Sequence, residues 1–403
     1  MKKSLKIISL FTLVVVLILT VTSCKKDKKD TIRIASVGPI SGDVAIYGNS
    51  TKKGIELAIE EINNNGGILV DDKQMKIEWV GMIDDEASSD KAATAFNTQY
   101  AKNIDLMLGA ITSGATEGLV GQAIGKKLLV ITPTGTADYI TVGKNGDERD
   151  LRTNIFRACF NDSYQGEVAA KFISNNLKKT KVAVLYNNED SYSMGLYNSF
   201  KNLATTNQID IVYEQSYQNN SVDFKTAWNS IKSSGAEVVF LPEYYEKVVT
   251  IVSQGRDAGY NGTIVGADGW DGVLSVDGVD ENDFTNCYFS NHFAVDSNEA
   301  VVNNFVNSYK SKYNENPTSF AALGYDAVYI YKKAVEEAKS IEFDKVLEVL
   351  TSSNFYADVV TGRITFAANG NAVKPAVVMT FENKNYKYYT CLLYTSPSPR
   401  DRQ

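Results

Sequence analysis

The stretch IRIASVGPISG, residues 32–42, decides the fold because it joins an apolar strand to a tight, exposed turn. Its first six residues predict a β-strand, which Gly38 and Pro39 end. A helix is predicted over 54–64, where isoleucines recur on one face and the following Asn-Gly-Gly stops it. Together they form the first strand–loop–helix unit of an α/β protein.

The same unit recurs along the body of the chain. Further strands are predicted over 75–80, 105–110, 128–131, 182–186, 238–241 and 263–265, and helices over 92–102, 115–126 and 166–177. Alternating strands and helices predict parallel sheets with helices on both faces. Because two such series follow one another, we expect two Rossmann-like α/β lobes. No long linker separates them, which favours lobes that are joined by short crossings and close like a hinge.

The N-terminus predicts export and a lipid anchor. A basic start precedes the apolar run 7–21, which is too short to span a bilayer comfortably but suits a signal peptide. The run leads into Val-Thr-Ser-Cys, and small residues before Cys24 resemble the lipobox of bacterial lipoproteins, whose cysteine is lipid-modified. We therefore expect a signal peptide over 1–23 and a lipid-anchored tether over 24–30. The alternative is a transmembrane anchor with an incidental cysteine.

The C-terminus differs in character from the body. Serine and proline alternate within 391–403, which excludes a helix or a central strand there. The segment resembles translated sequencing-adapter sequence. We therefore treat it as a non-native tail and Cys391 as incidental.

Composition narrows the range of functions. The 403 residues carry a formal net charge of −7 with both signs interspersed, which argues against a nucleic-acid partner. His292 is the single histidine, whereas most hydrolytic triads and zinc sites need one or more. Cys159 and Cys287 fit either a disulfide or two buried thiols. We expect no metal, no cofactor and no enzymatic activity, and we expect a monomer.

Ligands of open parallel sheets bind at the carboxyl ends of the strands, so the following loops hold the candidate site. Tyr47 comes shortly after the first strand. Ser113 lies in a loop of small hydroxyl residues that opens a helix, where free backbone N–H groups suit a carboxylate; ordinary helix capping is the alternative. Thr134 and Thr136 lie in a similar loop after the fourth strand. Two such loops suit the head group of a zwitterion.

Three further candidates follow strands of the second series. Tyr192 follows the strand 182–186, Tyr244 the strand 238–241 and Asp268 the strand 263–265. A carboxylate at a strand end can pair with an ammonium ion through charge-assisted hydrogen bonds. The alternative for Asp268 is a plain turn, since Asp-Gly is a common turn dipeptide.

Taken together, these motifs resemble one family, the type I periplasmic solute-binding proteins of the leucine/isoleucine/valine receptor group. The resemblance extends from Thr31 to about Tyr389. Its marks are GPISG at 38–42 with Tyr-Gly at 47–48, Asn-Gly-Gly at 65–67, Asp-Asp at 84–85, Thr-Pro-Thr at 132–134, DSYQG at 162–166 and GRITF at 362–366. Each mark is weak alone, but their order and spacing make the set specific.

The resemblance implies a fold, a partner and a set of contacts. Lobe 1 would comprise 31–155 plus 288–362 and lobe 2 would comprise 156–287 plus 363–389, with crossings near 154–160, 286–291 and 362–366. The protein would deliver an amino acid, branched-chain or otherwise apolar, to an ABC transporter permease. Ser113 and Thr136 would hold the α-carboxylate, and Thr134, Thr136 and Asp268 the α-ammonium. Tyr47, Tyr192, Tyr244 and Phe320 would line the side-chain pocket.

Two departures from the family and three rival functions remain open. Asp268 stands where the best-known receptors have glutamate, and Trp270 beside it could narrow the pocket. The same fold could instead bind urea, a short amide or an aromatic acid, or serve as a ligand sensor for a separate signalling partner. An enzyme would need an activated nucleophile, and no Gly-x-Ser-x-Gly motif is present.

Overall fold

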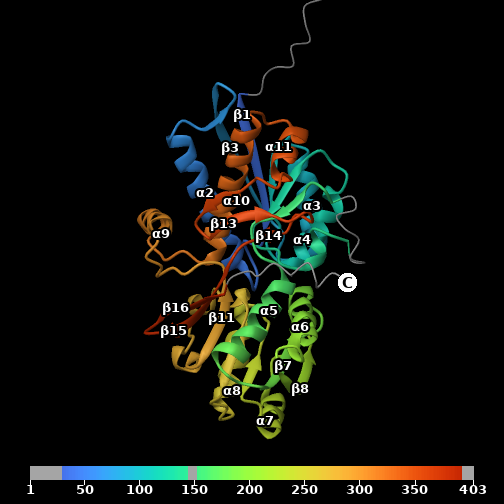
Figure 1. Ribbon diagram of the computed structural model, residues 1–403, viewed down its shortest axis with the longest axis vertical. Helices are drawn as coiled ribbons and strands as arrows, with labels where there is room; N and C mark the ends of the chain where they lie inside the picture. Colours follow the sequence, from blue (N-terminus) through green and yellow to red (C-terminus); the bar gives the residue numbers. More distant parts are fainter. Residues whose placement is uncertain (1–29, 144–151, 393–403) are drawn as a thin grey trace, which may run out of the picture. The chain divides into compact units, whose positions relative to one another are not determined.

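The computed structural model describes residues 30–143 and 152–392 (Figure 1). The predicted signal peptide, Cys24, most of the tether and residues 393–403 lie outside this range, so those predictions stay predictions. Within the described range, no helix is long and apolar enough to cross a membrane. The structure has the predicted α/β class, with two sheets that each define one lobe.

The sheet of lobe 1 has the strand order β2-β3-β1-β4-β5-β6. Its strands are β1 (Thr31–Gly38), β2 (Ile68–Val70), β3 (Lys73–Asp84), β4 (Leu106–Leu108), β5 (Leu129–Thr132) and β6 (Ile155–Arg157). β1, β4, β5 and β6 run parallel to one another, as predicted, and β2 pairs with β3 in the antiparallel sense. Their parallel carboxyl ends therefore meet along one edge.

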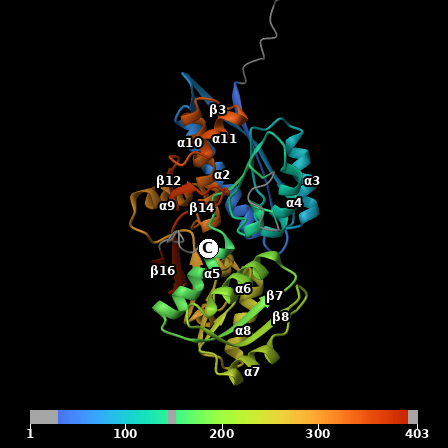
Figure 2. The same cartoon turned by 45° about the vertical axis from the view of Figure 1, so that its right-hand side comes forward.

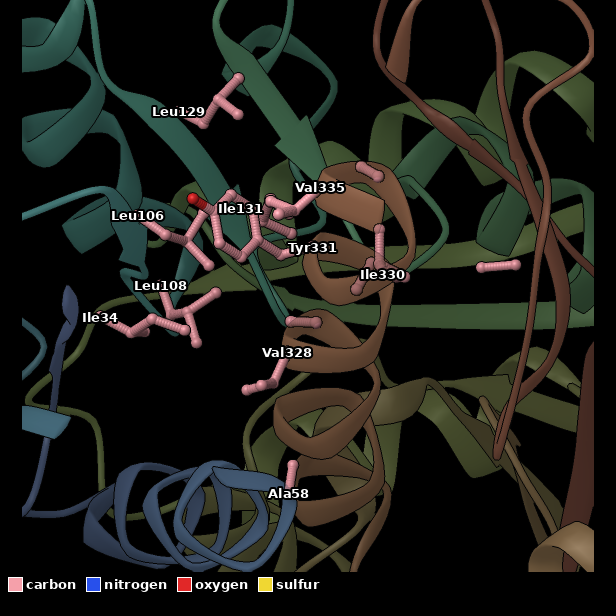
Figure 3. Close-up of a cluster of buried hydrophobic side chains, with 14 of the residues drawn as sticks. Ile34, Ala58, Leu106, Leu108, Leu129, Ile131, Val328, Ile330, Tyr331 and Val335 are labelled. Atoms are coloured by element: carbon pink, nitrogen blue, oxygen red, sulfur yellow. The ribbon is translucent and has the colours of Figure 1, made fainter. Parts of the chain in front are cut away.

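Helices cover both faces of this sheet. They are α2 (Ala45–Asn64), α3 (Ser89–Tyr100), α4 (Ser113–Ala123), α10 (Ser319–Ala338) and α11 (Phe343–Leu350), while α9 (Ala300–Tyr313) packs on the outside against α2 and α10. Ile34 and Leu106 share a core with α2 and α10, and Figure 3 shows Val328 and Tyr331 of α10 facing these strands. The alternate residues Ala35 and Met107 pack with α3 and α4. Burial on both faces explains the nearly continuous apolar strands in the sequence.

The sheet of lobe 2 has the order β16-β15-β11-β10-β9-β7-β8. Its strands are β7 (Lys181–Asn187), β8 (Asp210–Tyr217), β9 (Val238–Phe240), β10 (Thr263–Gly266), β11 (Cys287–Asn291), β15 (Ala376–Glu382) and β16 (Asn385–Leu392). The helices α5 (Asp162–Lys171), α6 (Ser191–Ala204), α7 (Lys225–Ser234) and α8 (Tyr245–Asp257) flank it (Figure 2). β15 and β16 form an antiparallel edge that the sequence did not predict. Cys391 pairs with Val377 in this edge, although it was assigned to the tail.

Two of the expected crossings between lobes lie later in the chain than predicted. β11 was expected to be a crossing, but it is an inner strand of lobe 2 between β10 and β15. A small sheet of β12 (Ala357–Val359), β13 (Gly362–Phe366) and β14 (Ala372–Val373) stands where the third was expected, and Ile364 of β13 lies in the core of lobe 1. The chain therefore changes lobe after Asn291 and after Val373. The crossings that the family resemblance implied were therefore placed a few residues early, and the apolar pattern could not correct them, because a short apolar strand has the same pattern in either lobe.

Helix α2 begins nine residues before its predicted start, at Ala45. Tyr47 therefore lies in its first turn and not in the preceding loop. The buried positions of the first three turns include Ser50, Thr51 and Gly54. Because these residues are small or polar, the apolar periodicity that marks a helix in a sequence is missing here.

The small residues of α2 allow a close approach to α10. A Cβ on Gly54 would lie 1.9 Å from the Ala321 carbonyl oxygen, and one on Gly324 would lie 2.5 Å from that of Thr51. This contact brings Tyr47 and Phe320 into a stack with ring centroids 4.0 Å apart. Helix packing in lobe 1 thus places two of the predicted pocket residues.

The two candidate disulfide cysteines are unpaired. Cys159 and Cys287 are both buried and free. Burial raises the pKa of each thiol to about 12. Of the two possibilities left open by the sequence, the structure has two buried, protonated thiols.

Replacing Gly54 tests the contact between α2 and α10. Gly54→Ala should lower the free energy of unfolding by ~1–3 kcal/mol, because the α10 backbone must move away. A Cβ added to Gly121 of α4 would have no atom within 4 Å, so Gly121→Ala should be neutral or stabilise by ~0.5–1 kcal/mol. Urea unfolding measures both. A Gly54→Ala protein as stable as the wild type would contradict the packing.

Candidate functional site

The candidate site is built first from two loops of lobe 1. Ser113 opens α4 directly after the loop that follows β4, and Thr134 and Thr136 follow β5. The Thr134 hydroxyl donates to the Ile111 carbonyl at 2.7 Å, and Ser113 Oγ accepts from the Ala137 N–H at 3.2 Å. These bonds tie the two loops together. The N–H groups in the first turn of α4 have no partner within the helix, so this end of the helix attracts an anion.

Arg157, at the end of β6, supports the second of these loops. Its side chain is fully buried, and its guanidinium donates to the carbonyl oxygens of Gly135 and Ala137, each at 2.9 Å. Sequence reasoning did not identify this residue. An arginine that ends a buried strand beside a candidate loop was the available signal.

Three residues of lobe 2 lie opposite. Tyr192 lies at the start of α6 and Tyr244 immediately precedes α8. Asp268 opens a short 3-10 helix, Asp268–Trp270, directly after β10. Each lies beyond the carboxyl end of a parallel strand, which is where the sequence placed it.

All of the predicted binding residues line one narrow pocket, whose cavity volume is about 10 Å³. They are Tyr47, Ser113, Thr134, Thr136, Tyr192, Tyr244, Asp268 and Phe320, and Ile111, Thr112 and Gly269 complete the lining. The last three were not predicted to bind, although each stands beside a residue or in a loop that was singled out.

Aromatic rings form much of the pocket wall. Tyr47 stacks on Phe320, and its ring stands edge-on to Tyr244 with centroids 5.6 Å apart. Tyr192 and Tyr244 stack in parallel at 4.8 Å. The Tyr47 hydroxyl donates to the Gly269 carbonyl, so rings from both lobes enclose the space.

Asp268 is the buried charge of the pocket. One carboxylate oxygen accepts from the Tyr192 hydroxyl at 2.8 Å and from the Gln165 amide at 2.9 Å. The other lies 3.1 Å from Nε2 of His292. Burying a carboxylate costs little free energy only when hydrogen-bond donors or a cation surround it, and these neighbours reduce that cost for Asp268.

His292 is a neighbour of the pocket that sequence reasoning did not connect with Asp268. Its buried ring touches Asp268 and stacks on Phe160 at 3.7 Å. It directly follows β11, whose carboxyl end meets that of β10. The signal was available but depended on assigning β11 to lobe 2.

Trp270 does not narrow the pocket as expected. Its ring is buried in the core of lobe 2, and its Nε1 donates to the Leu241 carbonyl at 3.0 Å. The 3-10 turn after Asp268 directs this side chain beneath the sheet edge. Trp270 therefore anchors the short helix that carries Asp268 to the core of lobe 2.

Three buried polar atoms at the pocket have no hydrogen-bond partner among the described residues. They are Oγ1 of Thr112, Oγ1 of Thr136 and the hydroxyl of Tyr244. Buried polar atoms are nearly always paired in native proteins, so all three are available to a solute or to water. The pocket thus combines an anion-attracting helix end, one carboxylate, unpaired hydroxyls and apolar rings.

A wider cleft continues outward from Thr112 and Tyr244. Its lining includes Asp43, Glu86, Asp190, Glu243 and Glu246, with Lys247 as a basic residue. Burial raises the pKa of Glu243 to about 7, while hydrogen bonds from Tyr217 and Asn187 oppose the shift. The approach to the pocket is therefore predominantly acidic.

Comparison with known proteins places this geometry in one family. The family model for periplasmic binding proteins matches residues 31–386. The Leu/Ile/Val-binding protein BraC3 of Rhizobium johnstonii is 27% identical over 344 residues, which cover 84% of this chain and 88% of that protein.

Two solved structures agree with this assignment. The branched-chain amino acid transporter substrate-binding protein LivJ of Streptococcus pneumoniae, in complex with isoleucine, has a TM-score of 0.78 and 30% identity, covering 89% of this chain and 99% of that one. The leucine-binding protein LivK of Thermotoga maritima has a TM-score of 0.79 and 26% identity, covering 92% and 100%. The chain belongs to the periplasmic binding protein family, in its type I group of leucine/isoleucine/valine receptors.

Proposed function

We propose that this protein captures an α-amino acid with an apolar side chain and delivers it to an ABC transporter permease. The observation that carries the proposal is the pairing, across one small pocket, of the α4 N-terminus in lobe 1 with the Asp268 carboxylate in lobe 2. A zwitterionic head group carries the two opposite charges that these ends attract. The names of the matched relatives, which bind leucine, isoleucine or valine, agree with this choice.

The lobe 1 end suits the α-carboxylate. Ser113 contributes a hydroxyl at the helix N-terminus, and the Thr112 hydroxyl is buried and has no partner among the described residues. Thr136 lies on the neighbouring loop, which Arg157 holds in place. Hydroxyl and backbone donors stabilise a carboxylate without a lysine or arginine, as at other anion-binding helix ends.

The lobe 2 end suits the α-ammonium. Asp268 supplies the negative charge, and the Thr134 carbonyl and Thr136 hydroxyl lie on the facing loop. The carboxylate already accepts from Tyr192 and Gln165 and lies 3.1 Å from Nε2 of His292, but two oxygens offer about four acceptor positions. One further donor can therefore bind.

The aromatic wall suits an apolar side chain of moderate size. Tyr47, Tyr192, Tyr244 and Phe320 present ring faces and edges, and Ile111 adds an aliphatic surface. The cavity left between these side chains is only about 10 Å³, so a bound solute must separate them, and a small amino acid requires less separation than a peptide. Burying such a side chain adds roughly 1.5–3 kcal/mol of binding free energy.

Closure of the two lobes traps the solute. The Tyr47 hydroxyl bonds to the Gly269 carbonyl across the lobes, and the Ile46 N–H donates to the Tyr245 hydroxyl at 3.3 Å. Asp271 of lobe 2 accepts from the Ser319 N–H of α10 at 2.6 Å. We infer that the open protein binds the solute on lobe 1 and that closure then brings Asp268 and the tyrosines onto it.

We also propose, from the N-terminal sequence, where this activity takes place. A signal peptide over 1–23 and lipidation of Cys24 would tether a monomeric receptor to a bacterial membrane, in the periplasm or at the cell surface. Mass spectrometry of the processed N-terminus tests the anchor. A diacylated cysteine at position 24 is the expected result, and an unmodified Cys24 would contradict it.

Replacing Asp268 tests the head-group assignment. Asp268→Asn should weaken amino-acid binding at least a hundredfold, because a buried ammonium without a counter-charge costs about 3–5 kcal/mol. Glu243→Gln removes another buried carboxylate of lobe 2 that lies outside the pocket, and should change affinity less than threefold. Calorimetry with L-leucine and L-isoleucine measures both. Equal affinities in the two variants would refute the assignment, and a thermal-shift screen of amides and aromatic acids would then identify the solute class.

Removing the Tyr47 hydroxyl tests closure. Tyr47→Phe keeps the ring stack but loses the bond to Gly269, so affinity should fall about threefold to tenfold. Tyr217→Phe is the matched control, since it removes a buried hydroxyl bond to Glu243 within lobe 2 alone. The Tyr47 variant should also speed hydrogen exchange around 244–270, measured by mass spectrometry. Unchanged exchange and affinity would show that the interlobe bond has no role.

A further inference from the structure

His292 connects the pocket to the crossings between lobes. It follows β11 where the chain leaves lobe 2, and it stacks on Phe160 beside the first crossing. Its other neighbour is Lys374 at the third crossing, whose ammonium group donates to the Ala158 carbonyl at 3.3 Å. The ring thus stands among all three connections and reaches Asp268 through Nε2 at 3.1 Å.

The other two donors to Asp268 have a fixed direction. The Gln165 carbonyl oxygen accepts from the Asp268 N–H at 3.2 Å and from the Ser290 hydroxyl at 3.0 Å, so its amide nitrogen must face the carboxylate. The Tyr192 hydroxyl accepts from the Gly269 N–H at 2.8 Å, so its proton points to Asp268. Both donors bind the same oxygen, Oδ1. His292 is the hydrogen-bond partner that the described residues supply to Oδ2.

The surroundings favour a neutral ring protonated on Nε2. Nδ1 is buried and has no partner in the described part of the chain, so an imidazolium would bury an unpaired N–H. Burial lowers the pKa of His292 to about 4, while the bond to Asp268 acts in the opposite direction and Lys374 adds to the lowering.

The other charged groups near the ring fall into two sets. Asp162 and Asp271 act on Asp268, and burial raises the pKa of both carboxyl groups. Asp296, Glu299 and Lys387 line the cleft that His292 borders on its far side. The adjacent Cys159 thiol is neutral, since its pKa is raised to about 12.

We propose that His292 is a positioning residue for the solute's ammonium group: as a neutral ring it donates from Nε2 to Asp268 and holds the free side of Oδ2 toward the pocket. The inference rests on the proposed function and deepens it. A proton on His292 would supply the counter-charge that the ammonium otherwise provides. Protonation of His292 and amino-acid binding therefore oppose each other, and by linkage each weakens the other.

The sign of the pH effect follows from this linkage. Because the pKa of His292 is about 4, the ring is neutral above about pH 6 with or without solute, so protonation of His292 does not affect the affinity there. As the pH falls, the ligand-free protein takes up a proton on His292 before the complex does. Affinity for an amino acid should then decrease with falling pH, and for an analogue without an ammonium group it should not.

The first experiment observes the ring directly and needs no solute. Because His292 is the single histidine, nitrogen-15 and carbon-13 spectra of a histidine-labelled protein without an affinity tag report it alone. The expected result is an Nε2–H tautomer at pH 7 that titrates below pH 6, with shifted ring signals in Asp268→Asn. An Nδ1–H tautomer, or an imidazolium at pH 7, would overturn the proposal.

The second experiment separates positioning from general stability. His292→Phe keeps a ring to stack on Phe160 but has no donor, so affinity for L-isoleucine should fall about tenfold or more. Affinity for 3-methyl-2-oxopentanoate, which lacks the ammonium group, should change less than threefold. His292→Gln places an amide near the Nε2 position, so it should recover most of the lost affinity and abolish the decrease below about pH 5. Calorimetry between about pH 3.5 and 8 measures all three proteins, because the pKa of His292 is about 4.

The outcomes distinguish this inference from the proposed function. Equal losses for both solutes, or an unchanged pH profile in His292→Gln, would reduce His292 to a packing residue and overturn the inference. If the wild type binds no amino acid, the proposed function fails, and the ring spectra still decide whether His292 donates to Asp268. Phe160→Leu is the control: it removes the stacking partner, and should lower the unfolding temperature without altering the pH dependence of binding. If His292→Phe fails to fold, the glutamine variant and the spectra carry the test.

Discussion

The burial of one carboxylate, Asp268, constrains everything around it. A charge removed from water must be surrounded by donors or by a cation, and its donors come from parts of the chain that are far apart in sequence. Gln165 stands on α5, Tyr192 on α6 and His292 after β11. Their positions require the parallel order of β7, β9, β10 and β11, because only that order brings the strand ends to a common edge. The sheet of lobe 2 can therefore be understood as a frame for this charge.

Lobe 1 contributes the complementary end by a different means. Among the described residues it places no charged side chain at the pocket, and it relies on the start of α4, on hydroxyl groups and on two loops bonded to each other. Close packing of α2 on α10 then places Tyr47 and Phe320 over the space. Under the proposed function, a charged lobe that faces a dipolar lobe would bind a zwitterion most tightly when the two lobes are brought together, so that binding and closure would occur together.

The crossings between the lobes contain buried charged and polar residues, which a simple linker does not need. Lys374 is buried beside Asp326, which accepts from two backbone N–H groups of the segment that leads into β13. Burial lowers the pKa of Lys374 to about 8, and attraction to Asp326 opposes that change. Phe160 and His292 lie against the same region. A hinge built from buried polar pairs permits few alternative arrangements, because each alternative would leave a charge unpaired.

Much of the fold and of the candidate site could be predicted from the sequence. Strand and helix periodicity predicted two parallel-sheet lobes, and the rule that sites follow strand ends selected Ser113, Thr134, Tyr192 and Asp268, which line one pocket together with the residues that the family resemblance added. These features are local, since a loop that ends a strand is visible wherever the strand lies. Three features could not be predicted from the sequence: the boundaries of the lobes, the start of α2 and the contact of His292 with Asp268. Each depends on which strand lies beside which and on how closely two helices approach, and such long-range neighbours leave no periodic trace in the chain.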